Sequence, residues 1–230
     1  MGSEMCIRDS LVGYLCGSIP VGFLIGKIGY NIDVRKHGSG NIGMANVMRL
    51  CGKKAGIMTM IGDMVKGTIA VLSGRILIWT KNFEGLGKIG QVELTNEGLF
   101  LSLIVFTTII GHSFPVWLKF KGGKSASVGG GAILGINPIA FVIIMSLWVV
   151  ILKKTKYTSL SNLVAGTLYP PLLWVFAGND PFFNNNWQAA IVGAICLLFV
   201  IWRHRENVSR LIKGTERKIG QKEKIEEKKD

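Results

Sequence analysis

Three polar, glycine-rich clusters interrupt an otherwise apolar sequence, and the first is suited to binding an anion. It covers residues 38–49 and reads Gly-Ser-Gly-Asn-Ile-Gly-Met-Ala-Asn-Val-Met-Arg. Glycines allow backbone N–H groups to converge on an anion, and a helix that begins near Gly43 would direct its positive end to the same place. On that helix Asn46 and Arg49 would share one face, and a guanidinium can hold a phosphate with two hydrogen bonds. The spacing predicts a phosphate site, for which a flexible connector is the alternative interpretation. The candidate contacts are Ser39, Gly40, Asn41, Asn46 and Arg49.

The second cluster joins residues 111–115 (Gly-His-Ser-Phe-Pro) to residues 120–125 (Phe-Lys-Gly-Gly-Lys-Ser). Its Gly-Lys-Ser triplet resembles the end of a nucleotide-binding P-loop. That motif requires a Gly at the position of Leu118 and a preceding strand, so binding of a nucleoside triphosphate is excluded. Gly122 and Gly123, followed by the charge of Lys124, instead predict a backbone nest for a phosphate, although membrane topology alone could account for the lysines.

A third polar cluster, Arg203-His204-Arg205-Glu206-Asn207, closes the last apolar segment. His204 and Asn207 are three residues apart and therefore face the same side of a helix at the membrane interface. An imidazole at this depth can accept or share a hydroxyl proton near neutral pH. Interfacial anchoring by an Arg-rich helix end is the alternative interpretation.

Hydroxyl-bearing side chains open another predicted helix, in the stretch 157–162 (Tyr-Thr-Ser-Leu-Ser-Asn). Helix capping is the favoured role for this stretch. Contact between Ser159 and a substrate is the second interpretation.

The segments between these clusters are those of an integral membrane protein. Of the 230 residues, 49% are hydrophobic, and the mean hydropathy is +0.39. A helix needs about 20 apolar residues to span a bilayer, and the longer segments meet that requirement. The apolar segments lie roughly at 11–30, 55–79, 98–118, 127–152, 159–178 and 188–202.

The net charge of +13 is distributed as in a membrane protein. Lys and Arg fall in short blocks between apolar segments, so nucleic acid is excluded as a partner. The connections 80–97 and 179–187 lack an excess of basic residues. The positive-inside rule therefore places these two connections outside and the basic blocks in the cytoplasm. The basic blocks are 31–54, 119–126, 153–158 and the tail from Arg203.

Two of the basic blocks, 119–126 and 153–158, require the apolar segment between them to turn back. Asn137-Pro138 interrupts this segment, because Pro lacks an N–H group and clashes with the preceding helical turn. Helices over 127–136 and 139–152 would rise only about 15 and 21 Å. We expect a hairpin of two short helices whose tip points outward. The result is an all-α, polytopic fold of about seven transmembrane helices, with the N-terminus outside and the C-terminus inside; a re-entrant loop would give five.

One apolar segment, 55–79, contains Asp63 and Lys66. A lone charge near the centre of a bilayer costs roughly 2.5–3.5 kcal/mol. Three residues apart, the two side chains can meet on one helix face that is turned toward the bundle interior. A structural ion pair is the favoured interpretation, and direct contact with a substrate is the alternative.

The remaining sequence indicates one domain without a metal or disulfide framework. The four Cys residues show no CxxC spacing, and the carboxylates are too few and too dispersed for a metal cluster. Residues 1–10 are polar and match nothing downstream, so we set them aside as a non-native scar. We expect a single membrane domain over 11–213 and a charged cytoplasmic tail over 214–230.

Together the clusters resemble the PlsY family, the acyl-phosphate-dependent glycerol-3-phosphate acyltransferases of bacteria. The resemblance implies an inner-membrane enzyme of seven helices whose active site faces the cytoplasm. It also implies acyl transfer from acyl phosphate to the sn-1 hydroxyl of glycerol 3-phosphate, which gives lysophosphatidic acid and inorganic phosphate without a cofactor. The expected partners are these substrates, the lipid bilayer and the enzyme that supplies acyl phosphate. The matching stretches are 14–20, 39–49, 111–124 and 204–207, and they span nearly the whole chain from residue 11 to about 213.

The resemblance also implies residue roles. In the family the Ser and Arg of the first motif matter for activity, the Gly-Gly-Lys motif is associated with phosphate binding, and a Glu in the last motif is structural. These positions are Ser39 and Arg49; Gly122, Gly123 and Lys124; His204 and Asn207; and the structural Glu206. The chain departs from the family pattern at Met44 and Ala45, at Ser125, at Ser127 and Val128, and at Asn162.

A different class of acyltransferase pairs a His with an Asp five residues later. In this sequence the residues five after the three histidines are Ile42, Trp117 and Ser209. That dyad is therefore excluded. Phosphate is a good leaving group, so positioning matters more than a strong base. We expect Arg49, Lys124 and the glycine N–H groups to hold the two phosphates. His204 and Asn207 would orient glycerol 3-phosphate while a substrate phosphate oxygen takes the hydroxyl proton; His204 as general base is the alternative.

Two other function classes share some of these features. A transporter of a phosphorylated solute would use a basic, glycine-rich interior and a broken hairpin, but the sequence has no internal repeat and its polar clusters lie on one side. A non-catalytic scaffold whose basic loops bind anionic lipids would not require His204 and Asn207. The acyltransferase remains the favoured interpretation.

Overall fold

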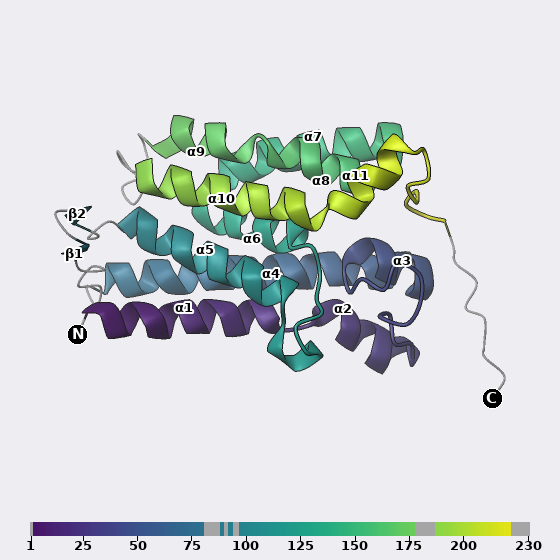
Figure 1. The fold of residues 1–230 in the computed structure, drawn as a ribbon, viewed down its shortest axis with the longest axis horizontal. Helices are drawn as coiled ribbons and strands as arrows, with labels where there is room; N and C mark the ends of the chain where they lie inside the picture. The colour runs from purple at the N-terminus through teal and green to yellow at the C-terminus, as the bar shows by residue number, and fades with distance from the viewer. Residues whose placement is uncertain (1, 81–87, 90–91, 94–96, 178–186, 222–230) are drawn as a thin grey trace.

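The structure, a computed structural model, describes residues 2–80, 88–89, 92–93, 97–177 and 187–221. Over these residues it is a bundle of helices that run roughly along one axis (Figure 1). The helices are α1 (Gly2–Ser18), α2 (Val21–Leu24), α3 (Met44–Cys51), α4 (Lys53–Trp79), α5 (Glu97–Ser113), α6 (Ala126–Ile136), α7 (Pro138–Thr155), α8 (Thr158–Gly166), α9 (Tyr169–Ala177), α10 (Trp187–Arg203) and α11 (Arg205–Ile212). Smaller elements are a π-helical turn η1 (Ile25–Gly29), a 3-10 turn η2 (Val116–Leu118) and an antiparallel pair of two-residue strands, β1 (Lys88–Ile89) and β2 (Val92–Glu93). The predicted all-α fold is confirmed apart from this small strand pair.

Helix α4 is the centre of the bundle, with α3, α5 and α6 packed against it, while α1 packs along α5. The approach between α4 and α6 is close because glycines lie at the crossing. A Cβ atom on Gly67 would overlap the carbonyl oxygen of Val128, and one on Gly131 would overlap that of Met64. Small residues that bring two helix backbones together are typical of membrane proteins, where packing replaces the hydrophobic effect between helices.

The outward face of α4 carries exposed apolar side chains, as expected of a helix that faces lipid. A continuous exposed stripe of this kind would promote association in water. The stripe consists of Ile61, Val65, Ile69, Leu72 and Ile76. Four helical segments are long and apolar enough to cross a membrane: Ser10–Gly29, Lys53–Trp79, Glu97–Leu118 and Pro138–Thr155.

The break predicted at Asn137-Pro138 is present and separates α6 from α7. Pro138 is the first residue of α7, and the Asn137 side chain caps that helix by accepting a hydrogen bond of 2.9 Å from the Ala140 N–H. Arg75 of α4 donates a hydrogen bond of 2.6 Å to the carbonyl of Ile136, the last residue of α6. The C-terminal end of α6 is therefore satisfied by a neighbouring helix, as polar backbone at membrane depth requires.

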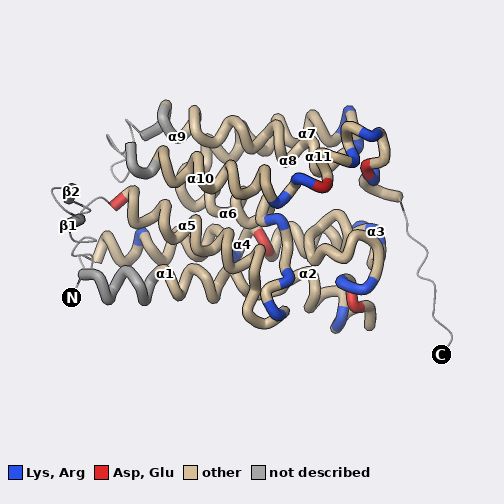
Figure 2. The backbone as a smooth tube through the Cα atoms, viewed as in Figure 1, with Lys and Arg blue, Asp and Glu red and all other residues tan. Residues whose placement is uncertain are grey.

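Lys and Arg gather at one end of the bundle, the end that carries α3 and α11 (Figure 2). The connections from η2 to α6 and from α7 to α8 lie toward the same end (Figure 1). The blocks predicted for the basic side of the membrane therefore meet at a single end. The connections predicted for the opposite side, 80–97 and 179–187, lie mostly outside the described residues.

The N-terminal segment 1–10, interpreted from the sequence as non-native, continues α1 as a helix from Gly2. A helical backbone does not test its origin, so that interpretation stays a prediction. At the other terminus, the tail beyond Ile212 turns back at Gly214, whose φ of +69° favours a glycine. The Ile219 N–H then donates to the Lys156 carbonyl at 2.8 Å, which brings the start of the tail against the α7–α8 connection.

Candidate active site

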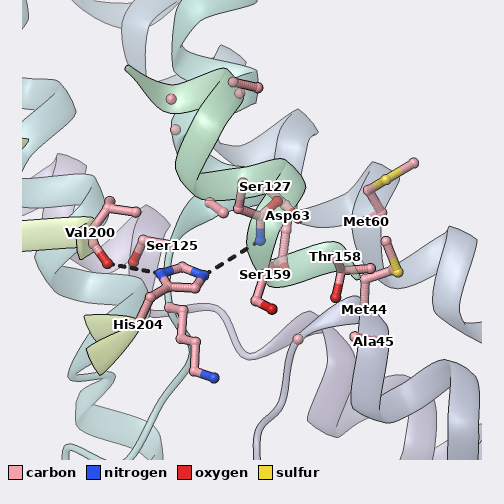
Figure 3. A pocket seen from close by; sticks show the side chains of 18 of the residues that line it. Met44, Ala45, Met60, Asp63, Ser125, Ser127, Thr158, Ser159, Val200 and His204 are labelled. Atoms are coloured by element: carbon pink, nitrogen blue, oxygen red, sulfur yellow. Dashed lines mark hydrogen bonds between the residues drawn. The ribbon is translucent and has the colours of Figure 1, made fainter. Parts of the chain in front are cut away.

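One cavity at the basic end of the bundle brings the three polar clusters together (Figure 3). The clusters are distant in sequence, so their meeting supports one shared anion site, as predicted. Predicted site residues that line the cavity are Ser39, Asn41, Asn46, Arg49, Asp63, Lys124, Ser159, His204 and Asn207. Gly40, Lys66, Gly122, Gly123 and Glu206 are not among its lining residues.

The cavity changes from polar to apolar with depth. One wall runs from His204, directly after α10, back along that helix to Cys196, and another runs along α5 from His112 to Val105. With a rise of 1.5 Å per residue, these walls extend about 10–12 Å into the bundle. Such a shape fits a ligand with an anionic head and an apolar tail.

Asn46 holds the first cluster in shape. Its side-chain oxygen accepts a hydrogen bond of 2.9 Å from the Ser39 N–H, and its amide nitrogen donates to the carbonyls of Val34 (2.9 Å) and His37 (3.3 Å). The predicted substrate-binding residue Asn46 therefore uses its amide group within the loop, although it also borders the cavity. Ser39 is exposed at the cavity mouth.

The N-terminus of α3 borders the cavity, as the sequence predicted for a helix beginning near Gly43. Gly43 is the N-cap, and its own N–H donates to Asn41 Oδ1 at 2.8 Å. The Gly43 residue makes no side-chain cap for the next N–H groups, and Gly43, Met44 and Ala45 all line the cavity. The first N–H groups of a helix have no partner within it and carry its positive partial charge. Arg49, in the last turn of the same helix, is buried and lines the cavity too. Two of the departures from the family pattern, Met44 and Ala45, thus lie where an anion would bind.

The Gly122-Gly123 turn does not form the backbone nest for a phosphate that the sequence predicted. The Gly122 N–H donates to the Ser113 carbonyl at 3.1 Å, and the Gly123 N–H donates to the His112 carbonyl at 3.0 Å. These N–H groups are already paired with the end of α5, so they are not available to cradle a phosphate. What the turn provides is the placement of the next residue, Lys124, whose side chain enters the cavity.

Lys124 begins a network of charged and polar groups across the cavity mouth. Its Nζ donates to Asn207 Oδ1, and Asn207 Nδ2 donates to Glu216 Oε1 at 2.6 Å. The Ser159 hydroxyl donates to the same Glu216 oxygen at 2.8 Å, and Arg210 Nε donates to Glu216 Oε2 at 2.8 Å. Glu216 therefore joins α8, α11 and the tail. The helix cap expected of the 157–162 stretch is not formed by Ser159, whose hydroxyl serves this network.

Glu216 is the site residue that sequence reasoning missed. It lies in the segment 214–230, which reads as an alternation of acids and bases, and the only local signal is the turn at Gly214 that returns the chain. Glu206, expected to be the structural acid, has a side chain that is 71% exposed and lies 3.9 Å from Arg210. An exposed pair of this kind contributes little to stability. The buried hydrogen bonds that tie α8 and α11 together are made by Glu216.

His204 is held as a neutral acceptor. Its Nδ1 donates to the Val200 carbonyl at 2.8 Å, so the lone pair lies on Nε2, 3.5 Å from the Asn162 amide nitrogen (Figure 3). Trp148 Nε1 donates to Asn162 Oδ1 at 2.7 Å, and this bond turns the amide nitrogen of Asn162 toward His204. Asn162 is one of the positions where the chain departs from the family pattern. Burial, together with the charge of Lys124, lowers the pKa of His204 to about 4. Such a weak base favours orientation of a hydroxyl over full removal of its proton.

The charged pair predicted within 55–79 forms on α4. Lys66 Nζ lies 3.0 Å from Asp63 Oδ1, and both side chains are buried. The favoured interpretation, a structural ion pair, is consistent with this contact. Asp63 also borders the cavity, so the alternative of substrate contact stays open for that residue.

Comparison with known proteins decides the family. The sequence profile described as glycerol-3-phosphate acyltransferase matches residues 9–214. Relatives named glycerol-3-phosphate acyltransferase include one from Desulforamulus reducens, 37% identical over 209 residues that cover 91% of this chain and 92% of the relative. Another, from Rubrobacter xylanophilus, is 39% identical over 211 residues that cover 91% and 93%. The chain belongs to the glycerol-3-phosphate acyltransferase family.

Solved structures agree with this assignment. The chain is similar to PlsY, an integral membrane glycerol 3-phosphate acyltransferase, in crystal structures of its glycerol 3-phosphate form and its lysophosphatidic acid form. The TM-scores are 0.76 and 0.75 at 28% and 27% identity, and each comparison covers 94% of this chain and 96% of the other. The resemblance drawn from the motifs is confirmed. The protein is an integral membrane glycerol-3-phosphate acyltransferase, an enzyme of phospholipid synthesis.

We predict that Glu216→Gln impairs this acyltransferase while Glu206→Gln does not. Gln lacks the charge and has only one oxygen, so its NH2 group must face either Arg210 or the Asn207 and Ser159 donors, and hydrogen bonds to charged groups contribute about 1.5–3 kcal/mol. Glu216→Gln should therefore lower kcat/KM for glycerol 3-phosphate by about tenfold or more and lower the melting temperature in detergent. Glu206→Gln, the matched control, should stay within about twofold of the wild type. Equal effects of the two substitutions would contradict the assignment.

We also predict an alkaline limb in the pH profile of kcat/KM. Burial, with the nearby charge of Arg210, lowers the pKa of Lys124 to about 8. The cationic form needed to bind a phosphate is present below this pKa, so activity should fall as the pH rises through about 8. Lys124→Arg should remove this limb, because a guanidinium stays charged at all working pH values. A limb near pH 6, where a phosphate monoester titrates, should be the same in both proteins. A wild-type profile that is flat up to pH 9.5 would exclude a binding role for the Lys124 charge.

Proposed function

We propose that this acyltransferase moves a fatty acyl group from acyl phosphate to the sn-1 hydroxyl of glycerol 3-phosphate, and releases lysophosphatidic acid and inorganic phosphate. The observation that carries the proposal is the meeting of Arg49, Lys124, His204 and Asn207, from three separate clusters, at the polar end of one cavity whose depth is apolar. The cations suit two phosphate-bearing substrates, and the apolar walls suit an acyl chain that enters from the bilayer.

In the proposed reaction the glycerol oxygen forms a bond to the acyl carbonyl carbon, and the bond from that carbon to the phosphate oxygen breaks. The leaving phosphate takes the electron pair of the broken bond. Arg49 and Lys124 hold the two phosphates, while the first turn of α3 offers further N–H donors near Met44 and Ala45. The orientation supplied by fixed donors of this kind lowers the barrier more than a strong base would for such an activated donor.

His204 Nε2 is the acceptor that orients the glycerol hydroxyl in this scheme. The hydroxyl proton finishes on a phosphate oxygen of the substrate, which is more basic than an imidazole whose pKa is about 4. Asn207, tied to Lys124 and Glu216, orients the glycerol 3-phosphate beside it. General-base catalysis by His204 is the alternative, and it would add an acidic limb to the profile that disappears in His204→Asn.

We propose further that the protein crosses the bacterial inner membrane about seven times, with its N-terminus outside and its active site in the cytoplasm. The gathering of Lys and Arg at the end that carries the cavity supports this orientation by the positive-inside rule (Figure 2). This count treats α6 and α7 as a hairpin whose tip points outward, and the bond from Arg75 to the Ile136 carbonyl supports it by satisfying the backbone beside that tip. A re-entrant hairpin, for which the 11 residues of α6 and their rise of about 16 Å would suffice, gives five crossings instead. The enzyme that supplies acyl phosphate would approach at the basic end.

A transporter of a phosphorylated solute is the alternative function, favoured only by the basic cavity and the broken hairpin. Counterflow of labelled glycerol 3-phosphate into liposomes, in the absence of any acyl donor, would support it. Absence of counterflow together with product formation would exclude it.

The test of the proposed function supplies purified protein with glycerol 3-phosphate and either acyl phosphate or acyl-CoA. We expect lysophosphatidic acid from acyl phosphate alone. Arg49→Ala and Lys124→Ala should each lower kcat/KM by more than about tenfold while the protein stays folded in the membrane, because each removes a charged contact to phosphate. Product from acyl-CoA alone would refute acyl phosphate as the donor. Wild-type activity in both variants would refute the assignment of Arg49 and Lys124 as phosphate-binding residues.

A further inference from the structure

A set of buried polar groups joins α4 to α5 beside the cavity. The Lys66 ammonium group lies 3.0 Å from Asp63 Oδ1, 2.8 Å from His112 Nδ1 and 2.7 Å from the Ile19 carbonyl oxygen. The side chains of Lys66, Asp63 and His112 are all no more than 5% exposed. Charged side chains buried within a membrane-spanning helix cost free energy and usually have a function. The proposed acyl transfer uses none of the three directly.

Lys66 determines which nitrogen of His112 carries the proton. An ammonium group has three protons to donate and no lone pair. Asp63 Oδ1 lies at ion-pair distance, while the Ile19 carbonyl and His112 Nδ1 lie at hydrogen-bond distance from the ammonium group. His112 Nδ1 is therefore an acceptor, and the neutral ring carries its proton on Nε2. The Asp63–Lys66 pair thus fixes the position and the tautomer of the ring.

The opposite edge of the ring faces the Gly122-Gly123 turn. A Cβ atom on Gly123 would overlap His112 Nε2, and one on Gly122 would overlap the His112 carbonyl oxygen and the ring of Pro115. The Gly123 N–H also donates to the His112 carbonyl at 3.0 Å. His112 therefore contacts the turn with both its backbone and its ring, and the turn has no side chains because α5 leaves no room for them.

Arg203 holds the same turn from α10. Its Nη2 donates to the Gly123 carbonyl at 2.8 Å, and its guanidinium lies 5.1 Å from the ring centroid of Phe114. Gly123 is fixed between His112 and Arg203, so the backbone of the next residue is fixed as well. That residue is Lys124, whose side chain reaches Asn207 and the cavity.

We propose that His112, oriented by the Asp63–Lys66 pair, is a positioning residue that directs Lys124 into the active site. The inference rests on the proposed function, in which Lys124 holds a substrate phosphate. It gives the two glycines a different purpose from anion binding: they admit the end of α5 and the His112 ring. His112 borders the cavity, and the role proposed for it is exerted through Lys124.

The proposal is tested first by a compensating pair of substitutions. Gly123→Ala adds a methyl group against the His112 ring, and Gly123 does not have a positive φ, so the backbone itself accepts Ala. His112→Asn removes the outer edge of the ring and keeps an oxygen that can accept from Lys66. Gly123→Ala alone should lower kcat/KM by about tenfold or more. In the His112→Asn background, Gly123→Ala should lower kcat/KM by less than about threefold, because the new methyl group no longer overlaps the ring.

A second cycle tests whether the effect passes through Lys124. Lys124→Ala should lower kcat/KM by more than about tenfold in the wild type, but by less than about threefold when His112→Asn has already misdirected the lysine. A purely structural role for His112 would leave the cost of Lys124→Ala unchanged. Losses that multiply in both cycles would overturn the proposal.

Controls separate this proposal from folding defects and from the proposed function. Gly29→Ala is the matched glycine control, because a Cβ atom there meets no atom within 4 Å, and it should leave activity unchanged. Melting temperatures in detergent identify unfolded variants; if His112→Asn does not fold, His112→Ser, which also removes the outer edge of the ring, replaces it in both cycles. Wild-type turnover of acyl phosphate tests the donor by itself, whereas each cycle compares only ratios among variants. Failure of acyl phosphate as donor and absence of coupling between His112 and Lys124 are therefore distinct results.

Discussion

In a lipid bilayer, every backbone carbonyl that loses its helical partner must find another hydrogen-bond donor within the protein, and this constraint organises the structure. Two helix ends, and one turn at the basic end of the bundle, receive hydrogen bonds from cationic side chains of neighbouring helices. Lys66 donates to the Ile19 carbonyl where α1 ends before Pro20, Arg75 to the Ile136 carbonyl at the end of α6, and Arg203 to the Gly123 carbonyl before Lys124. Each of these cations also places the segment it binds. Breaks in the helices, which a membrane protein normally avoids, are thereby made into fixed points around the cavity.

The same constraint separates cations that hold the fold from those that face the substrate. Lys66 and Arg203 act on backbone and on His112, and neither is among the residues that line the cavity. Arg49 and Lys124 do line it, at the basic end of the bundle (Figure 2). Burial of Lys124 lowers its pKa, so the side chain is close to losing its proton near neutral pH. The same burial strengthens the attraction between the protonated side chain and an anion, because the local dielectric constant is low. An anionic substrate would restore that charge by pairing with it.

Most of the fold followed from hydropathy, basic blocks and one Pro, because these are local signals of a bilayer. The Asn137-Pro138 break, the helix that starts after Gly43 and the contact between Asp63 and Lys66 were all predictable from spacing. The partners of Asn46, Gly122 and Gly123 were not, because hydrogen bonds between segments depend on packing that spacing does not encode. A Gly-Gly-Lys sequence is equally compatible with an anion nest and with a turn packed against a helix end. Glu216 was missed for a related reason: only the return of the tail at Gly214 brings it to Ser159 and Asn207.

The central claim is that Lys124 binds a substrate phosphate, and protection of Lys124 from chemical modification tests it most directly. The purified protein would be treated with an amine-acylating reagent at about pH 8, where part of the Lys124 population is unprotonated, with and without saturating glycerol 3-phosphate. Mass spectrometry would then measure modification at each lysine. The account predicts that glycerol 3-phosphate slows modification of Lys124 strongly and leaves the exposed Lys119 and Lys121 unchanged. Equal rates at Lys124 with and without glycerol 3-phosphate would contradict it.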